Sequence, residues 1–129
     1  MVYKFSRRSL DNLRGVHPDL VAVVVAALYR YATIDFAVIE GVRDRDRQAE
    51  MVRQGKSWTM DSKHLIQPDG FAHAVDLAPW VDGGIPWDDW QAFYNLSQAM
   101  KFAARYMGVT ITWGGDWEVR DGPHFQLLR

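Results

Sequence analysis

The order of the predicted helices and strands constrains the fold of this chain most strongly. Apolar residues recur at helical spacing in the N-terminal part, where two helices are expected, the second beginning at Pro18. Short apolar or β-branched segments predict strands at residues 35–40, 72–78, 109–112 and 123–127. Helices that gather early, and late strands that lie close together in sequence, favour an α+β fold with a small, mainly antiparallel sheet flanked by helices.

Two further helices and one long loop complete the predicted elements. A polar helix is expected at residues 44–54, closed by Gly55, and a long amphipathic helix at 88–107, ended by Gly108. Residues 56–71 contain Gly, Pro, Ser and Asp and lack a clean period, which predicts a loop. Loops of this length in a small domain are usually functional or disordered.

Length and charge narrow the class of protein. The chain has 129 residues, which suits a single domain over residues 1–129 with little room for a second. Its 15 Lys and Arg and 16 Asp and Glu give a formal charge of −1, which argues against a dedicated nucleic-acid binder. The longest apolar run, residues 20–28, is too short to cross a bilayer, and residues 1–14 lack the apolar region of a secretory signal.

The chain contains no cysteine, which restricts the metal chemistry open to it. A disulfide scaffold, a thiolate zinc site, an iron–sulfur cluster and a cysteine nucleophile are all excluded. A tightly bound transition metal would need carboxylates and some of the histidines His17, His64, His73 and His124. Asp76 stands inside an apolar strand, where a carboxylate is costly to bury unless it is paired or coordinated.

Strand geometry separates the candidate ligands. His73 and Asp76 are three residues apart, so they point to opposite faces of a regular strand and make poor co-ligands. His64 lies on the loop before the strand, free to reach the Asp76 face, and His124 begins the last strand. Together with Asp76 they form a two-histidine, one-carboxylate set, which in catalytic zinc sites leaves a position for water. The alternative is that Asp76 pairs with an arginine such as Arg43; His17 and His73 are expected to be structural.

Several other residues can be interpreted either as part of a functional site or as purely structural. Asp121 could serve as general base and then acid, or simply form a turn with Gly122. Arg43 could stabilise an oxyanion or hold a substrate carboxylate, or be a solvated charge in the alternating run 43–47. Trp113 and Trp117 could wall a cleft, although tryptophans in a small protein mostly serve the core.

Motifs along almost the whole chain resemble those of zinc peptidases of the D-alanyl-D-alanine carboxypeptidase (VanY-like) class. The resemblance is strongest to the L-alanyl-D-glutamate peptidases found as phage endolysins and bacterial wall hydrolases. Each motif is weak alone, but together and in this order they are highly specific. The core motifs are Ser62-Lys63-His64, Ala74-Val75-Asp76-Leu77, Ile111-Thr112-Trp113-Gly114-Gly115-Asp116-Trp117 and Asp121-Gly122-Pro123-His124-Phe125. They are preceded by Gly15-Val16-His17-Pro18-Asp19-Leu20, Glu40-Gly41-Val42-Arg43, Arg47-Gln48 and Gly55-Lys56-Ser57.

The resemblance implies a fold like that of the hedgehog and D-Ala-D-Ala peptidase domains, and it implies roles for individual residues. It makes His64, Asp76 and His124 the ligands of Zn²⁺ and Asp121 the catalytic acid and base. It makes Arg43 a second catalytic residue, near the substrate, and it implies supporting or substrate-contacting roles for Ser62, Trp113 and Asp116. Beside this catalytic domain, no separate cell-wall-binding domain is expected. One departure is the lengthened connection at residues 66–71, with Ala72 where the family usually has Gly; it could alter cleft width or substrate entry.

The function implied by the resemblance is hydrolysis of the L-Ala–D-Glu bond of murein stem peptides by a zinc-dependent endolysin, leading to host-cell lysis. Two alternatives stay open: a D-Ala-D-Ala carboxypeptidase or dipeptidase of cell-wall metabolism, and a non-catalytic wall-binding module. By analogy with phage lysins, we expect a monomer made in the host cytoplasm without a signal peptide or membrane insertion. It would reach the murein after a holin opens the membrane. A bacterial housekeeping role stays an alternative setting.

Overall fold

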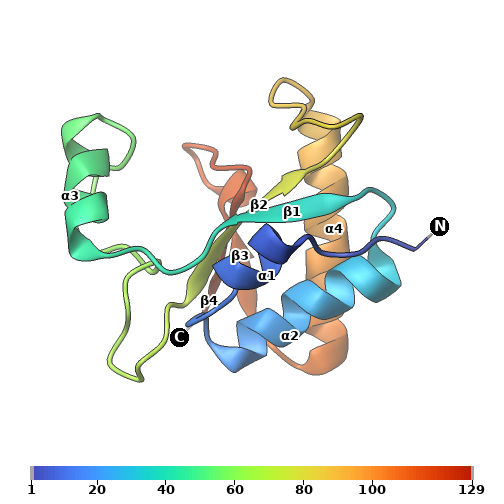
Figure 1. Cartoon of the computed structure of the whole chain (residues 1–129), viewed down its shortest axis with the longest axis horizontal. Coiled ribbons are helices and arrows are strands. Elements are labelled where there is room, and N and C mark those ends of the chain that lie inside the picture. The colour runs from blue at the N-terminus through green and yellow to red at the C-terminus, as the bar shows by residue number, and fades with distance from the viewer. Residues whose placement is uncertain (1, 129) are drawn as a thin grey trace.

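An antiparallel sheet forms the centre of the computed structural model, which describes residues 2–128 (Figure 1). Its four strands are ordered β1-β2-β4-β3, and all three pairings are antiparallel. The strands are β1 (Phe36–Glu40), β2 (Ala74–Pro79), β3 (Ile111–Trp113) and β4 (His124–Leu127). The predicted α+β class with a small antiparallel sheet is therefore confirmed.

The helices begin where the sequence offers a capping side chain. They are α1 (Arg7–Asn12), α2 (Pro18–Ala26), which continues as the π-helix η1 (Ala27–Tyr31), α3 (Arg45–Arg53), α4 (Trp90–Met107) and the 3-10 turn η2 (Gly114–Asp116). The side chains of Ser6, His17, Asp44 and Asp89 accept a backbone N–H at the starts of α1 to α4. Gly108 ends α4 with a φ of 69°, a left-handed conformation that glycine adopts without strain.

Three elements begin two residues later than expected. Strand β2 begins two residues later than predicted because Ala72 forms isolated bridges with Val16 and Ile66 instead of the sheet ladder. Helix α4 begins at Trp90 because Asp89 is its cap. Strand β3 is shifted toward the C-terminus and includes Trp113.

The apolar core holds the sheet against α2 and α4. Leu96 and Met100 of α4 are fully buried, as are Leu77 of β2, Phe125 of β4 and Leu20 of α2. Helix α3 lies apart from this packing, at the opposite end of the molecule from the N-terminus (Figure 1). Burial of this kind makes the sheet a rigid support for side chains on its other face.

The register of the sheet brings chemically active residues together. Asp76 of β2 lies opposite His124 of β4 and also opposite Glu40 of β1, next to an irregularity between Val38 and Glu40. Directly opposed residues of neighbouring strands have side chains about 4.5–5.5 Å apart at Cβ.

Among the described residues, no helix has the length and apolar character needed to cross a membrane.

Candidate active site

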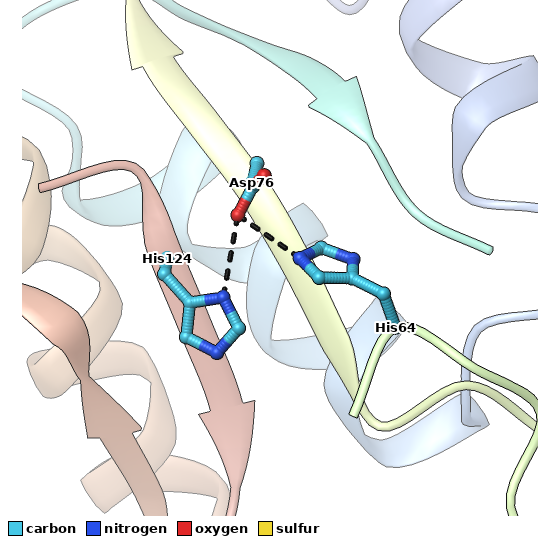
Figure 2. A group of neighbouring side chains, drawn as sticks. All are labelled: His64, Asp76 and His124. Atoms are coloured by element: carbon cyan, nitrogen blue, oxygen red, sulfur yellow. Dashed lines mark hydrogen bonds and ion pairs between the residues drawn. The ribbon is translucent and has the colours of Figure 1, made fainter. Parts of the chain in front are cut away.

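The three predicted metal ligands converge on one point (Figure 2). Asp76 projects from β2, His124 from β4, and His64 from the loop that precedes β2. The Asp76 Oδ1 atom lies 3.1 Å from His64 Nε2 and 3.4 Å from His124 Nδ1. One potential ligand atom from each residue lies within 4.8 Å of the others, a spacing that can hold a metal ion.

The outer nitrogen of each imidazole faces an oxygen acceptor. His64 Nδ1 lies 2.8 Å from the carbonyl of Gly41, and His124 Nε2 lies 2.8 Å from Gln126 Oε1. If these outer nitrogens carry the protons, the inner nitrogens present lone pairs toward Asp76 Oδ1. Three electron-rich atoms then face each other, and a cation would satisfy all of them. The donor set therefore fits a divalent metal ion held by two histidines and a carboxylate.

Protons on the inner imidazole nitrogens can take the place of the cation, because these nitrogens then donate to Asp76. Burial opposes the charge on Asp76, but hydrogen bonds with His124 and His64 outweigh it and hold the pKa of Asp76 well below its ordinary value. The pKa of His124 is raised, since attraction to the Asp76 carboxylate outweighs the desolvation that would lower it. The cluster thus attracts positive charge, whether as protons on the imidazoles or as a metal ion.

Arg43 belongs to the same cluster and is only 6% exposed, so its reading as a solvated charge is wrong. Its Nε donates to Glu40 Oε1 at 2.5 Å, and its Nη1 donates to Gln48 Oε1 at 2.8 Å. Its Nη2 lies 3.6 Å from Asp76 Oδ2. Asp76 therefore directs one oxygen toward the histidines and the other toward Arg43, so the predicted pairing with Arg43 does not exclude a role of Oδ1 as a metal ligand.

A cavity of about 510 Å³ opens in front of the cluster. Its wall includes the three potential ligands, together with Arg43, Ser62, Asp121, Trp117 and Gln126. The opposite side comes from α3 and the following loop, through Met51, Lys56, Ser57, Trp58, Thr59, Asp61 and Lys63. Residues of the loop predicted at 56–71 thus form a large part of the cavity wall.

Asp121 stands in this wall on the turn that enters β4. Desolvation, and then the negative charge of Asp76, raise the pKa of Asp121 above its ordinary value. A carboxylate with a raised pKa accepts a proton more readily than an ordinary one. The position and the basicity of Asp121 both suit a group that exchanges protons with a molecule in the cavity.

The chain matches the family model of phage L-alanyl-D-glutamate peptidases over residues 1–127. It belongs to this family. The L-alanyl-D-glutamate peptidase of Escherichia phage T5 is 30% identical to it, over 100% of this chain and 92% of that protein. The L-alanyl-D-glutamate peptidase of Listeria phage A118 is 33% identical over 73% of this chain, which spans 31% of that longer protein.

A solved structure has the same fold. The crystal structure of the Serratia marcescens L-Ala D-Glu endopeptidase ChiX superimposes with a TM-score of 0.86 at 44% sequence identity, covering 98% of this chain and 90% of that one. These matches confirm the resemblance drawn from the motifs. The chain is a peptidase of this family.

Ser62 and Trp113 lie where they can support the active site of the peptidase. Ser62 Oγ accepts a hydrogen bond of 3.1 Å from the backbone N–H of His64. Trp113 is buried in the core and does not line the cavity, but its Nε1–H donates at 2.7 Å to the carbonyl of Gly122, beside Asp121. Asp116, by contrast, is exposed and pairs with Lys101 at 2.8 Å, and the structure does not bring it to the cavity.

The glycines of the motif around Trp113 let the Asp121 turn approach. A Cβ on Gly114 would collide with the backbone oxygen and the Cβ of Asp121. The carbonyl of Gly114 also accepts the backbone N–H of Asp121 at 2.9 Å. This close backbone contact explains why the motif contains glycine at this position.

His17 and His73 lie outside the group formed by His64, Asp76 and His124, in a second group around the lengthened connection. His73 Nε2 lies 2.7 Å from Asp69 Oδ2, and His17 Nε2 lies 3.7 Å from the same oxygen. The contacts tie the 66–71 segment to the starts of α2 and β2. This segment does not line the active-site cavity, so its influence on substrate entry stays a prediction.

Gln48 is a part of the site that the sequence reading did not single out. It is fully buried on the otherwise polar α3, and all of its described contacts lead to the site. Its Oε1 accepts from Arg43, and its Nε2 donates to Ser57 Oγ at 2.9 Å and to the carbonyl of Thr59 at 2.6 Å. Gln48 therefore joins Arg43 to the loop that forms the far wall of the cavity. The available signal was its place beside Arg47 in the family motif.

Replacing Gln48 by alanine is expected to destabilise the peptidase by about 1–3 kcal/mol, because it leaves buried donors and acceptors without partners. It should also lower kcat, since Arg43 and the 57–59 segment lose their common support. Chemical unfolding and steady-state kinetics measure the two effects. Gln54→Ala is the matched control, because Gln54 is exposed and contacts only Glu50 through its side chain. Equal kinetics for the Gln48→Ala and Gln54→Ala variants would contradict this role.

The carboxyl group of Asp121 is expected to titrate above 3.8, the ordinary value, in the metal-free protein. The sign follows from its environment, because desolvation and the Asp76 charge both favour the protonated form. Carbon NMR of labelled carboxyl groups measures the midpoint, and the Asp121→Asn variant assigns the signal. A midpoint at or below 3.8 would show that the cavity does not raise the basicity of this group.

Proposed function

We propose that this chain is a zinc-dependent endopeptidase that hydrolyses the L-Ala–D-Glu bond of peptidoglycan stem peptides. The observation that carries the proposal is the convergence of His64, Asp76 and His124 in a cavity that also contains Asp121, in a chain of this peptidase family. The activities of the relatives supply the bond, and the donor set favours zinc over Mg²⁺ or Ca²⁺, which prefer all-oxygen ligands.

In the proposed site, His64, Asp76 and His124 hold the ion, with Gly41 and Gln126 fixing the two imidazole rings. When bound, the ion would act as a Lewis acid, polarising the peptide carbonyl and lowering the pKa of a water molecule. Asp121 accepts the proton of the attacking water and passes it to the leaving amine, the role that its raised pKa suits.

Arg43 has two proposed roles. Its contact with Asp76 Oδ2 orients that carboxylate, so that Oδ1 stays directed at the two histidines. Because Arg43 also lines the cavity, its positive charge favours the oxyanion that develops on the scissile carbonyl or the carboxylate of a D-Glu residue. Ser62 is proposed to hold the backbone of His64 in place rather than to react.

We propose that residues 1–129 form one catalytic domain and act as a monomer on murein. As the relatives from phages suggest, the biological setting is host-cell lysis, with synthesis in the host cytoplasm and holin-dependent access to the wall. Neither a nucleic acid nor insertion into the membrane has a part in this proposal.

Mass spectrometry of the products of purified murein tests which bond is cut. Cleavage between L-Ala and D-Glu leaves L-Ala on the glycan strand and releases peptides that begin with D-Glu. A carboxypeptidase would instead release free D-Ala, and a wall-binding module would release nothing. Products that begin with D-Glu support the proposal, and free D-Ala as the main product would overturn it.

A further inference from the structure

A second cavity of about 550 Å³ lies at the other end of β1 and β2 from the metal cluster. Its wall is formed by residues 4–9, by β1 and the residue before it, and by Trp80, Ile85 and Trp87 from the segment that follows β2. In Figure 1 the N-terminal segment and the start of β1 lie at the end of the molecule away from α3. Asp35 and Trp80 are five and four residues along the chain from Glu40 and Asp76, so roughly 13–17 Å of extended chain separates these two pairs of residues.

Two exposed indole rings belong to this cavity. Trp80 is 43% exposed and Trp87 is 59% exposed. The backbone of Trp80 is anchored, because its N–H donates to the carbonyl of Asp35 at 2.9 Å, and the Trp87 ring stacks on Phe93 with 5.9 Å between centroids. Large aromatic rings exposed together beside a cavity are typical of a binding surface.

The cavity also contains an unsatisfied acceptor. Asp35 Oδ1 is buried and has no hydrogen-bond partner among the described residues. Burial raises the pKa of the Asp35 carboxyl, and the backbone N–H of Phe36 offsets part of that rise. A buried polar atom without a partner is uncommon in folded proteins, and a ligand N–H or O–H group would complete it.

Basic side chains stand on the same side. Lys4 and Arg8 line the cavity, and residues 2–14 hold four basic residues against the single acid Asp11. The cavity therefore presents flat apolar rings, one acceptor and two cationic donors. A ring with apolar C–H faces would match the indole rings. Hydroxyl or acetamido groups on it could donate to the acceptor, and its hydroxyl or carboxyl oxygens could accept from the two cations.

An extended peptide fits the cavity less well. The outward-facing backbone groups of Val38 on the edge strand β1 are already used: its N–H donates to Ser9 Oγ at 3.0 Å, and its carbonyl accepts from Asn12 Nδ2 at 2.8 Å. A peptide strand could not pair with β1 at this point, because α1 covers it.

We propose that this cavity binds a pyranose unit of the N-acetylated glycan strand of murein, while the stem peptide extends from that strand toward the metal site. The indole faces of Trp80 and Trp87 stack on the C–H faces of the sugar, Asp35 accepts one of its N–H or O–H groups, and Lys4 and Arg8 donate to its oxygens. This inference rests on the proposed function, because it takes murein as the substrate. It gives the catalytic domain its own means of holding the wall.

Kinetics with two substrates test the inference. Trp80→Ala and Trp87→Ala should raise KM for glycan-linked stem peptides roughly three- to tenfold, the size expected for loss of a ring stack. KM for the same stem peptide without glycan should stay unchanged. Tyr106→Ala is the matched control, because Tyr106 is 69% exposed and does not line this cavity. Unchanged KM values for both substrates would overturn the inference, and an equal rise for both would show that the cavity takes peptide instead.

Binding without turnover separates this inference from the proposed function. In NMR spectra of the unmodified protein, a tetrasaccharide of N-acetylglucosamine should shift the indole N–H signals of Trp80 and Trp87 more than that of Trp58, which lies in the active-site cavity. Such shifts would support the glycan site even if murein were not cleaved. Absence of shifts at millimolar sugar, with normal hydrolysis of murein, would overturn the glycan site and leave the proposed function intact.

Discussion

Replacing Asp121 by alanine is expected to abolish measurable hydrolysis while zinc stays bound. General acid and base catalysis by a positioned side chain typically contributes about 10²–10⁴-fold to rate, and here one group is proposed to perform both steps. Zinc binding should survive because Asp121 is not among the three converging ligands. Metal analysis of the purified variant and its rate on murein measure the two expectations together.

Asp116→Ala is the appropriate control for this experiment. Asp116 is an exposed carboxylate five residues earlier in the same region, it pairs with Lys101, and it lies outside the cavity wall. The Asp116→Ala variant should keep the activity of the unmodified protein. Full activity of the Asp121→Ala variant would eliminate Asp121 as the acid and base, and loss of zinc from it would show that Asp121 has a structural role.

The second large effect is expected from His64→Ala. This change removes one of the three proposed ligands and also the group that faces the Gly41 carbonyl. Loss of a residue that only hydrogen-bonds to a metal ligand commonly lowers metal affinity about 10–100-fold. Loss of the ligand itself should therefore lower zinc affinity by more than about 100-fold. Hydrolysis should fall with it. Competition with a chromophoric chelator measures the affinity.

His73→Ala provides the comparison for this variant. His73 is also a largely buried histidine with a carboxylate partner, Asp69, but it belongs to the other group of side chains. Its replacement should leave the zinc content at one ion per chain. If the His73→Ala variant loses zinc and the His64→Ala variant keeps it, the assignment of the ligands is wrong.

The sequence could predict that Asp76 and His124 lie together because both sit on strands, whereas His64 lies on a loop that was expected only to be free to reach them. The alternation of side chains along a strand separates Asp76 from His73, and the short distance between the late strands in sequence predicts that they pair. The structure then places Asp76 directly opposite His124. The alternation of side chains along a strand does not depend on the rest of the fold, so it can be predicted from the sequence.

The surroundings of Arg43 and Gln48 could not be predicted in the same way. Their burial depends on contacts between α3, the irregular end of β1 and the loop at 57–59. The pattern of residues within any one of these segments does not indicate that they pack together. An alternating run of charges looks the same whether one of its members turns inward or not. Trp113 and Asp116 illustrate the same limit, since neighbours in one motif lie in the core and in solvent.

Reconstitution of the metal-free protein tests the central claim most directly. The protein is freed of metal with a chelator, and zinc is then added in steps while the release of peptides beginning with D-Glu from defined murein is followed by mass spectrometry. The proposed function predicts no cleavage without metal and a linear return of cleavage that reaches its plateau at one zinc per chain. It also predicts no return in the His64→Ala variant at the same zinc concentrations. Cleavage of the L-Ala–D-Glu bond at an undiminished rate by the metal-free protein would contradict it.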